Sequence, residues 1–226
     1  MTAPALMPRV NPGSASARRA ALGDSPVSLA DIYQDEVNIA VWQRQLSSTV
    51  ADAAKQILDA TPNLQVSVSM SPDSVHENLT ASLGSDGPGL VLITDIAELA
   101  EMFACLFDLK RIGLRLTSLG HAMCPRFHVD NVPCRLVTTY AGSATEWLPH
   151  DRVQRSKLGP GSQGLPDAES GLYSSASDIQ QLGVGDVALL KGSGWEGNED
   201  GGLVHRSPQL AVGTKRLLLS LDFSMT

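Results

Sequence analysis

The strongest restriction on the fold is an alternation of apolar and polar side chains in the second half of the sequence. In residues 111–116, RIGLRL, every second side chain is apolar. This is the period of a strand with one buried face. Further strand-like runs and Gly-rich connections follow, the runs at 126–140, 185–191 and 214–223 and the connections at 156–171 and 192–202. The pattern predicts an α+β chain whose second half is a barrel or jelly roll.

The first half of the sequence has a mostly helical pattern. Apolar residues recur at steps of three and four between Ile39 and Ile57, and the polar residues 47–49 favour a division into two helices. Residues 64–70 alternate instead and predict one strand. Residues 95–107 predict a further helix. We therefore expect helices that pack against the β-rich half.

These patterns divide the chain into three expected regions. Residues 1–27 are expected to be a disordered tail, 28–108 a helical region packed on the core, and 109–226 the β domain. The first 23 residues contain three arginines and no acidic residue, a composition that a transit peptide also has.

Charge and cysteine content narrow the class of partner. The formal net charge of −7 argues against nonspecific binding to nucleic acid or to an anionic membrane. The three cysteines are too few, and odd in number, for a disulfide-stapled secreted domain. We expect a cytoplasmic protein that acts on a small-molecule or protein substrate. The sequence does not indicate its oligomeric state.

The segment RFHVDNVPCRLVTTY, residues 126–140, contains the most specific motif. On a strand, His128 and Asp130 would point to the same face and could converge on one ion. An imidazole and a carboxylate with open positions beside them are typical of a non-haem Fe(II) site, which also needs a second histidine. Alone, an H-x-D pair is weak evidence, because a polar strand face has the same pattern. His205, far downstream, is the candidate for the third ligand.

These residues resemble the motif of the Fe(II)- and 2-oxoglutarate-dependent dioxygenase superfamily, most closely its prolyl-hydroxylase-like branch. The motif is H-x-D, a distal histidine and a basic residue roughly ten positions later, matched here by His128, Asp130, His205 and either Lys215 or Arg216. The segments CRLVTTYAGSATEWLP and GVGDVALLKG also resemble strands of that family, although its Gly-Gly turn is Gly-Ser here. The chain is also similar to a bacterial family of unknown function.

The resemblance implies a double-stranded β-helix (jelly-roll) core that binds Fe(II) and 2-oxoglutarate. It implies an oxygenase, a hydroxylase of unknown substrate, with His128, Asp130 and His205 as metal ligands. A buried cation should bind the distal carboxylate of 2-oxoglutarate. Arg216 is favoured over Lys215 because it shares its strand face with Ser220 and Asp222.

Two neighbouring residues complete the prediction for the site. Tyr140 lies an even number of positions from Asp130, so on a regular strand it would face the same side and its hydroxyl could also bind the cosubstrate. Arg135 would face the opposite side and serve as a structural ion-pair partner.

Three other hypotheses remain open from the sequence. The residues His121, Cys124, His128 and Cys134 are of the types that zinc prefers, although their spacing matches no zinc motif that we can justify. A cupin-like protein could bind zinc or iron at the triad without oxygenase activity. An interaction protein could contain these motifs by chance.

Overall fold

The structure, a computed structural model, describes residues 18–224 and contains two β-sheets. The larger sheet has seven strands in the order β1 (Arg19–Gly23), β2 (Val37–Trp42), β8 (Val187–Lys191), β5 (Cys134–Ala141), β10 (Arg216–Phe223), β4 (Ile112–Leu119) and β3 (Gln65–Met70). The smaller sheet has three strands in the order β7 (Gln180–Gln181), β6 (Glu146–Leu148) and β9 (Val204–Arg206). β1 pairs with β2 in parallel, and the other pairs within these sheets are antiparallel.

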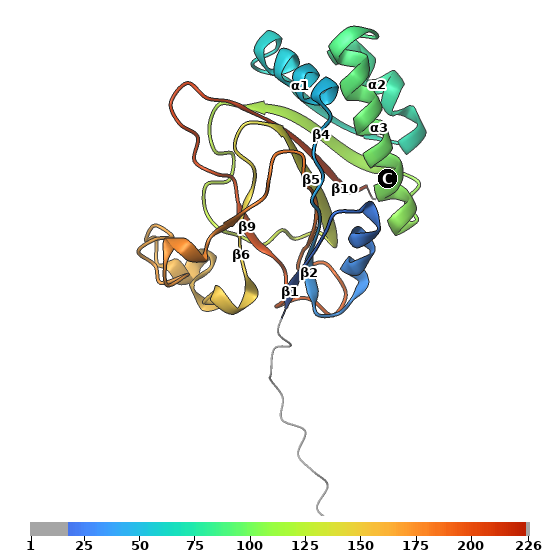
Figure 1. Cartoon of the computed structure of the whole chain (residues 1–226). Coiled ribbons are helices and arrows are strands. Elements are labelled where there is room, and N and C mark those ends of the chain that lie inside the picture. The colour runs from blue at the N-terminus through green and yellow to red at the C-terminus, as the bar shows by residue number, and fades with distance from the viewer. Residues whose placement is uncertain (1–17, 225–226) are drawn as a thin grey trace, which may run out of the picture.

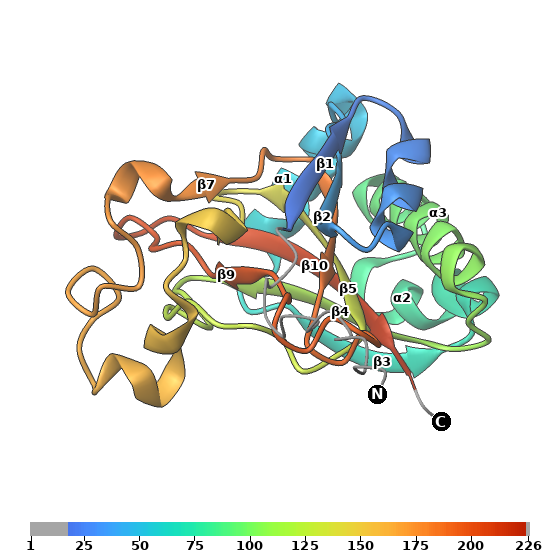
Figure 2. The same ribbon diagram turned by 90° about the horizontal axis from the view of Figure 1, so that it is seen from below.

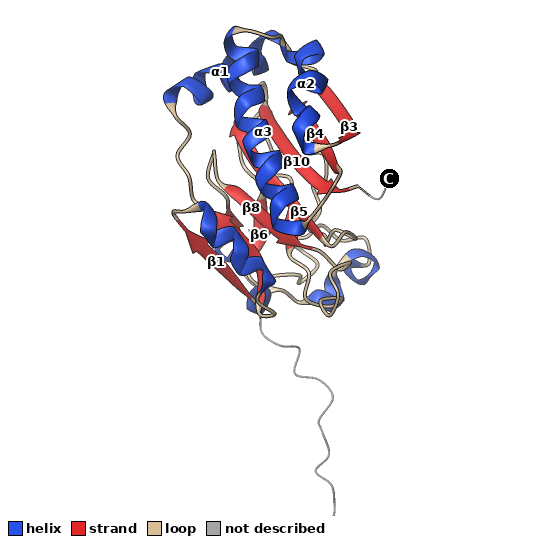
Figure 3. Ribbon diagram, turned by 90° about the vertical axis from the view of Figure 1, so that its right-hand side faces the viewer, coloured by secondary structure: helices blue, strands red, loops and turns tan. Residues whose placement is uncertain are grey.

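Helices cover one face of the larger sheet (Figures 1 and 3). They are the 3-10 helix η1 (Pro26–Tyr33) and the α-helices α1 (Ser48–Ala60), α2 (Val75–Leu83) and α3 (Gly87–Phe107). The described chain also has shorter 3-10 turns, η2 (Pro72–Ser74), η3 (His150–Arg152), η4 (Arg155–Lys157), η5 (Gly159–Ser162) and η6 (Ala176–Asp178). Figure 2 shows the long connection between β6 and β7, in yellow and orange, on the side of the molecule away from α2 and α3.

The alternation in β10 explains how the larger sheet separates a core from a cavity. Leu217, Leu219 and Leu221 are each 0 % exposed and belong to the core beneath the helices. Arg216, Leu218 and Ser220, which point to the opposite face, line a cavity. Because β10 lies between β5 and β4, this two-sided pattern continues across the centre of the sheet.

The smaller sheet packs over part of the opposite face. Val41, Val137 and Leu190 of the larger sheet form a second apolar cluster with Leu203, and Trp147 of β6 packs against it. The site described below lies between the two sheets. This mixed α/β architecture, with large antiparallel sheets, is consistent with the predicted jelly roll.

The structure corrects the division into a tail, a helical region and a β domain. Residues 19–23, assigned to the tail, form β1, and residues 1–17 lie outside the described residues. β1, β2 and β3, all from the first 108 residues, belong to the same sheet as β4, β5, β8 and β10. The larger sheet is therefore built from both halves of the sequence, not from 109–226 alone.

The segment 37–42, expected to be helical, is the strand β2. It is buried on both faces, so it lacks the alternation that identifies a half-buried strand. The expected division into two helices at 47–49 is therefore wrong, but a helix boundary does lie there: α1 begins after Ser47, whose hydroxyl accepts a hydrogen bond from the Val50 amide at 3.2 Å.

None of the helices in the described part of the chain combines the length and the apolar character that crossing a bilayer requires.

Candidate metal centre and its cavity

His128 and His205 are held side by side by their backbones. His205 lies on β9, and His128 forms an isolated antiparallel bridge with it. The amide of each residue donates to the carbonyl of the other at 3.0 Å. The two imidazole rings are 4.6 Å apart between centroids. The bridge thus places two residues that are remote in sequence at adjacent positions.

Asp130 completes a cluster of three metal-ligand types. Its Oδ1 atom lies 3.6 Å from Nε2 of His128, and its Oδ2 atom lies 3.4 Å from Nε2 of His205. One ligand atom from each residue lies within 4.8 Å of the others. Asp130 and His205 are largely buried, whereas His128 keeps about a third of its side chain exposed. The cluster therefore has an open side.

The second nitrogen of each imidazole is bonded so that Nε2 is available. Nδ1 of His128 lies 2.9 Å from the carbonyl oxygen of Arg126, and Nδ1 of His205 lies 3.2 Å from that of Leu203. A carbonyl oxygen only accepts, so both Nδ1 atoms carry the hydrogen and donate. Nε2 of each ring then faces Asp130. Two imidazole nitrogens and a carboxylate oxygen therefore converge on one point, and this donor set fits a divalent metal.

Asp130 is also held from behind by Arg135, whose Nη1 donates to Oδ2 of Asp130 at 2.7 Å. Arg135 donates with its remaining nitrogens to Asp222, from Nε at 2.6 Å and from Nη2 at 3.1 Å. Burial alone would raise the pKa of Asp130, but His128, His205 and Arg135 outweigh it and hold that pKa well below its usual range. The carboxylate is therefore ionised and fixed in orientation.

A glycine makes room for the backbone of the H-x-D segment. A Cβ atom on Gly192 would lie 2.1 Å from the carbonyl oxygen of Val132 and 2.6 Å from that of Asp130. This close approach lets the amide of Ser193 donate to the Asp130 carbonyl at 2.9 Å. The loop after β8 thus supports Asp130, and this role was not predicted from the sequence.

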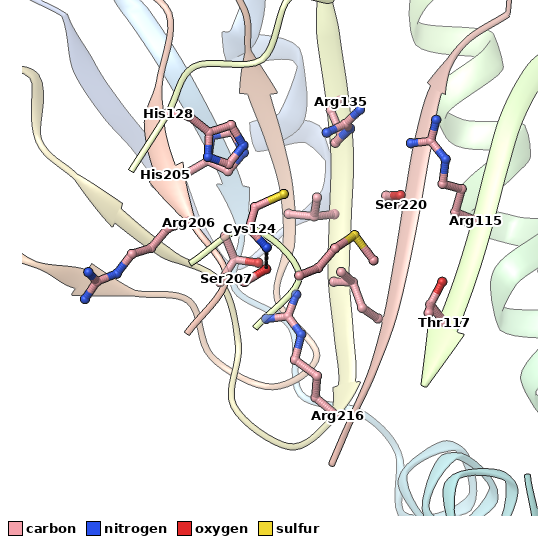
Figure 4. Close-up of a pocket in the computed structure, with 14 residues that line it drawn as sticks. Arg115, Thr117, Cys124, His128, Arg135, His205, Arg206, Ser207, Arg216 and Ser220 are labelled. Atoms are coloured by element: carbon pink, nitrogen blue, oxygen red, sulfur yellow. Dashed lines mark hydrogen bonds between the residues drawn. The ribbon is translucent and has the colours of Figure 1, made fainter. Parts of the chain in front are cut away.

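A cavity opens between the cluster and the larger sheet (Figure 4). His128, His205 and Ser207 line one side, and Arg216, Leu218 and Ser220 of β10 line the other, together with Arg115, Thr117, Met123, Cys124, Arg135, Val137, Thr145 and Arg206. Its volume is about 100 Å³. Its walls come from both sheets, and all the residues that line it belong to the second half of the sequence.

Arg216 projects into this cavity, as Figure 4 shows, and is only 2 % exposed. Its Nη1 donates to the carbonyl of Ser143 at 3.3 Å, and its Nε has no hydrogen-bond partner. Among the described residues no carboxylate forms an ion pair with it. Burial lowers the pKa of Arg216 to about 10. A buried cation without a counter-charge costs folding free energy and is a strong indication of an anionic ligand.

The turn directly after β5 packs closely against the backbone of this arginine. Gly142 has a φ of +82°, in the region that favours glycine, and a Cβ atom there would lie 2.3 Å from the carbonyl oxygen of Lys215. Lys215 itself points to the other side of the sheet, where its Nζ donates to the carbonyl of Pro62 at 3.4 Å. The structure brings Arg216, and not Lys215, into the cavity that the two histidines line.

The structure corrects the predictions for Tyr140 and Arg135. Tyr140 is buried under the helices, where its hydroxyl donates to Asp95 at 2.6 Å, so it does not reach the cavity. Arg135 does line the cavity, so its predicted direction is wrong, whereas it does form the expected ion pairs, with Asp130 and Asp222. The physical reason is that β5 begins only at Cys134, and the bent residues 131–133 interrupt the assumed strand. Alternation counted from Asp130 therefore assigned the side chains of β5 to the wrong faces.

The rival zinc set is not assembled. Cys134 is fully buried on the helix-covered side of β5, and burial raises the pKa of its thiol. His121 and Cys124 are exposed. Within residues 18–224, the group of potential metal ligands found together consists of His128, Asp130 and His205.

Comparison with solved structures finds similarity to oxygenases. The chain is similar to dioxygenase for auxin oxidation 1 from Arabidopsis thaliana in a binary complex with 2-oxoglutarate, at a TM-score of 0.53 and 8% identity, covering 91% of this chain and 92% of that one. It is also similar to a dioxygenase for auxin oxidation in rice (TM-score 0.48, 10% identity, 91% and 82% covered). A third similar structure is a prolyl-4-hydroxylase from Pseudomonas putida (TM-score 0.46, 12% identity, 89% and 98% covered).

The first of these similarities shows that the chain has the fold of a 2-oxoglutarate-dependent dioxygenase, so the predicted resemblance is confirmed at the level of the fold. A family model described as "Protein of unknown function (DUF1826)" matches residues 23–222. The chain therefore belongs to the DUF1826 family. No curated protein matches the sequence.

Proposed function

We propose that this protein is an Fe(II)- and 2-oxoglutarate-dependent oxygenase, and specifically a hydroxylase. His128, Asp130 and His205 would hold the iron, and Arg216 would bind the distal carboxylate of 2-oxoglutarate. The observation that carries the proposal is the buried Arg216, which lacks a carboxylate partner and lines the same cavity as the two histidines. A metal-binding protein without a cosubstrate has no need of that cation.

Ferrous iron held by two imidazoles and one carboxylate keeps coordination positions open for a chelating cosubstrate and for dioxygen, which is the chemistry such a site supplies. The protein's own residues prepare this site. The carbonyls of Arg126 and Leu203 fix the tautomers of the histidines, so that Nε2 is the ligand atom. Arg135 holds one oxygen of Asp130. That contact favours coordination of a metal through the other oxygen.

Arg216 would give the cosubstrate its orientation. A guanidinium presents parallel N–H donors that match a carboxylate, and burial strengthens such a pair by excluding water. The hydroxyl of Thr145 and that of Ser207 also line the cavity. With its distal carboxylate on Arg216, 2-oxoglutarate would be directed with its oxo acid end toward the triad.

The test is an anaerobic titration of the metal-free protein with Fe(II) and then with 2-oxoglutarate, followed by visible absorption. We expect a weak charge-transfer band that appears only when both are present, because chelation of ferrous iron by the oxo acid produces it. Metal binding without any spectral response to 2-oxoglutarate would instead favour the cupin-like protein without oxygenase activity. Absence of metal binding would contradict both.

A further inference from the structure

We propose that the substrate oxidised at this site is a small organic monocarboxylate with an apolar body, and that Arg115 of β4 binds its carboxylate. This inference rests on the proposed function, because it assumes that the metal and Arg216 are occupied by 2-oxoglutarate. It adds a substrate class and a specificity-determining residue.

The first observation is the sign of the charges around the cavity. Among the described residues that line it, the ionic side chains are four arginines, Arg115, Arg135, Arg206 and Arg216, and two histidines, with no aspartate or glutamate. The carboxylates of Asp130 and Asp222 contact Arg135 from outside the lining. The field inside the cavity is therefore positive and attracts anions.

The second observation is a charge balance with the cosubstrate in place. The total positive charge of Fe(II) and Arg216 is balanced by the total negative charge of Asp130 and the two carboxylates of 2-oxoglutarate. Arg115 and Arg135 then share the single carboxylate of Asp222. Arg206 has its own partner in Glu146, at 2.6 Å. One positive charge is left over, which a monoanionic substrate neutralises and a dianion would overcompensate.

The third observation identifies the group that is free to bind. Arg135 uses Nε, Nη1 and Nη2 on two carboxylates. Arg115 donates only from Nη1, to Oδ2 of Asp222 at 2.9 Å, and its side chain is 53% exposed. Figure 4 shows its guanidinium on the side of the cavity opposite the histidines. Arg115 is therefore accessible, and it keeps donors for a carboxylate that arrives from solvent.

The other residues that line the cavity beside Arg115 indicate that the rest of the substrate is apolar. Val137 and Leu218 line the cavity from the larger sheet, and Met123, itself 52% exposed, lines it from the loop before the H-x-D segment. Apolar side chains next to one free guanidinium fit a molecule with a hydrocarbon portion and a single acid group.

The experiment is calorimetric binding to the full chain loaded with Mn(II) and 2-oxoglutarate under anaerobic conditions, so that no turnover occurs. The probes are matched pairs of different size and shape, phenylacetate with phenylacetamide and hexanoate with hexanamide, together with phenyl phosphate as a dianion. The variants are Arg115→Gln and, as the matched control, Arg152→Gln, which removes an exposed arginine outside the cavity lining.

We expect at least one carboxylate to bind about tenfold more tightly than its amide, and this preference to disappear in Arg115→Gln but not in Arg152→Gln. Equal binding of acids and amides, binding of no carboxylate, tighter binding of phenyl phosphate, or a preference that survives Arg115→Gln would each overturn the inference. Failure of 2-oxoglutarate to bind in the loading step would overturn the proposed function as well, so the two failures are distinguishable.

Discussion

Each face of the larger sheet has a largely buried arginine, but only the arginine under the helices has a carboxylate partner. Under the helices, Arg44 donates from Nη1 and Nη2 to the two oxygens of Asp95, each at 2.9 Å, and Tyr140 donates to the same carboxylate. On the cavity face, Arg216 is even more completely buried, yet it has no carboxylate partner among the described residues. An ion pair that is complete on one face and incomplete on the other fits our proposal that a ligand completes the second one.

The comparison assigns stability to the helix-covered face and binding to the cavity face. Substitutions on the two faces should therefore separate these properties.

The largest effect is expected from His128→Ala, which removes one of the three ligands. Affinity for Fe(II) or Mn(II), measured by calorimetry, should fall by about a thousandfold or more. The free energy of unfolding should change little, because the bridge to His205 is formed by backbone atoms. His121→Ala is the matched control, since His121 belongs only to the rival zinc set. Equal losses of metal affinity in both variants would indicate that the metal binds to the rival zinc set.

The next effect is on stability and belongs to the helix-covered face. Asp95→Ala leaves Arg44 buried without its carboxylate and should lower the free energy of unfolding in urea by about 3–5 kcal/mol. Metal affinity of the folded protein should be unchanged. Asp52→Ala, an exposed aspartate on α1, serves as the control and should cost less than about 0.5 kcal/mol. A small effect of Asp95→Ala would mean that the pairing on this face does not stabilise the fold.

Arg135→Met should have an intermediate effect on the cavity face. Arg135 acts on the metal through Asp130, and loss of such a positioning contact typically lowers metal affinity about 10- to 100-fold. Arg115→Met removes the neighbouring contact to Asp222 and leaves Asp130 alone, so its metal affinity should stay near that of the wild type. If the two variants have the same affinity, Arg135 does not position Asp130.

The smallest effect should come from Arg216→Met, and its sign is informative. Replacing an unpaired buried cation with an apolar side chain of similar length should leave the free energy of unfolding unchanged or raise it by about 1 kcal/mol, as urea denaturation would measure. Lys215→Met is the neighbouring control. A decrease of about 2 kcal/mol or more in Arg216→Met would show that Arg216 serves the fold and would remove the contrast between the faces.

The sequence predicted side-chain directions correctly along regular strands. In β10, alternation favoured Arg216 for the polar face, and no bend interrupts the strand between Arg216 and Phe223. The bend at 131–133 made the predicted faces of Arg135 and Tyr140 wrong. Side chains alternate between the two faces with a period of two residues only along an unbroken strand. The Pro133 that precedes β5 was the available signal.

Other features depend on contacts that a local pattern does not contain. β2 is buried on both faces, so its apolar run could equally be read as part of a helix. The support of Asp130 by the loop at Gly192 depends on a close backbone approach between segments about sixty positions apart. The absence of a partner for Arg216 is a property of the folded cavity. The motif could nominate this residue but could not reveal that it is unpaired.

The most direct test of the central claim compares two oxo acids that differ at the carboxylate assigned to Arg216. We would measure binding of 2-oxoglutarate and of 2-oxobutyrate, which lacks the distal carboxylate, to Mn(II)-loaded wild type, Arg216→Met and Lys215→Met. The account predicts that the wild type and Lys215→Met prefer 2-oxoglutarate by about tenfold or more, and that Arg216→Met binds both oxo acids equally. A preference for 2-oxoglutarate that persists in Arg216→Met would contradict it.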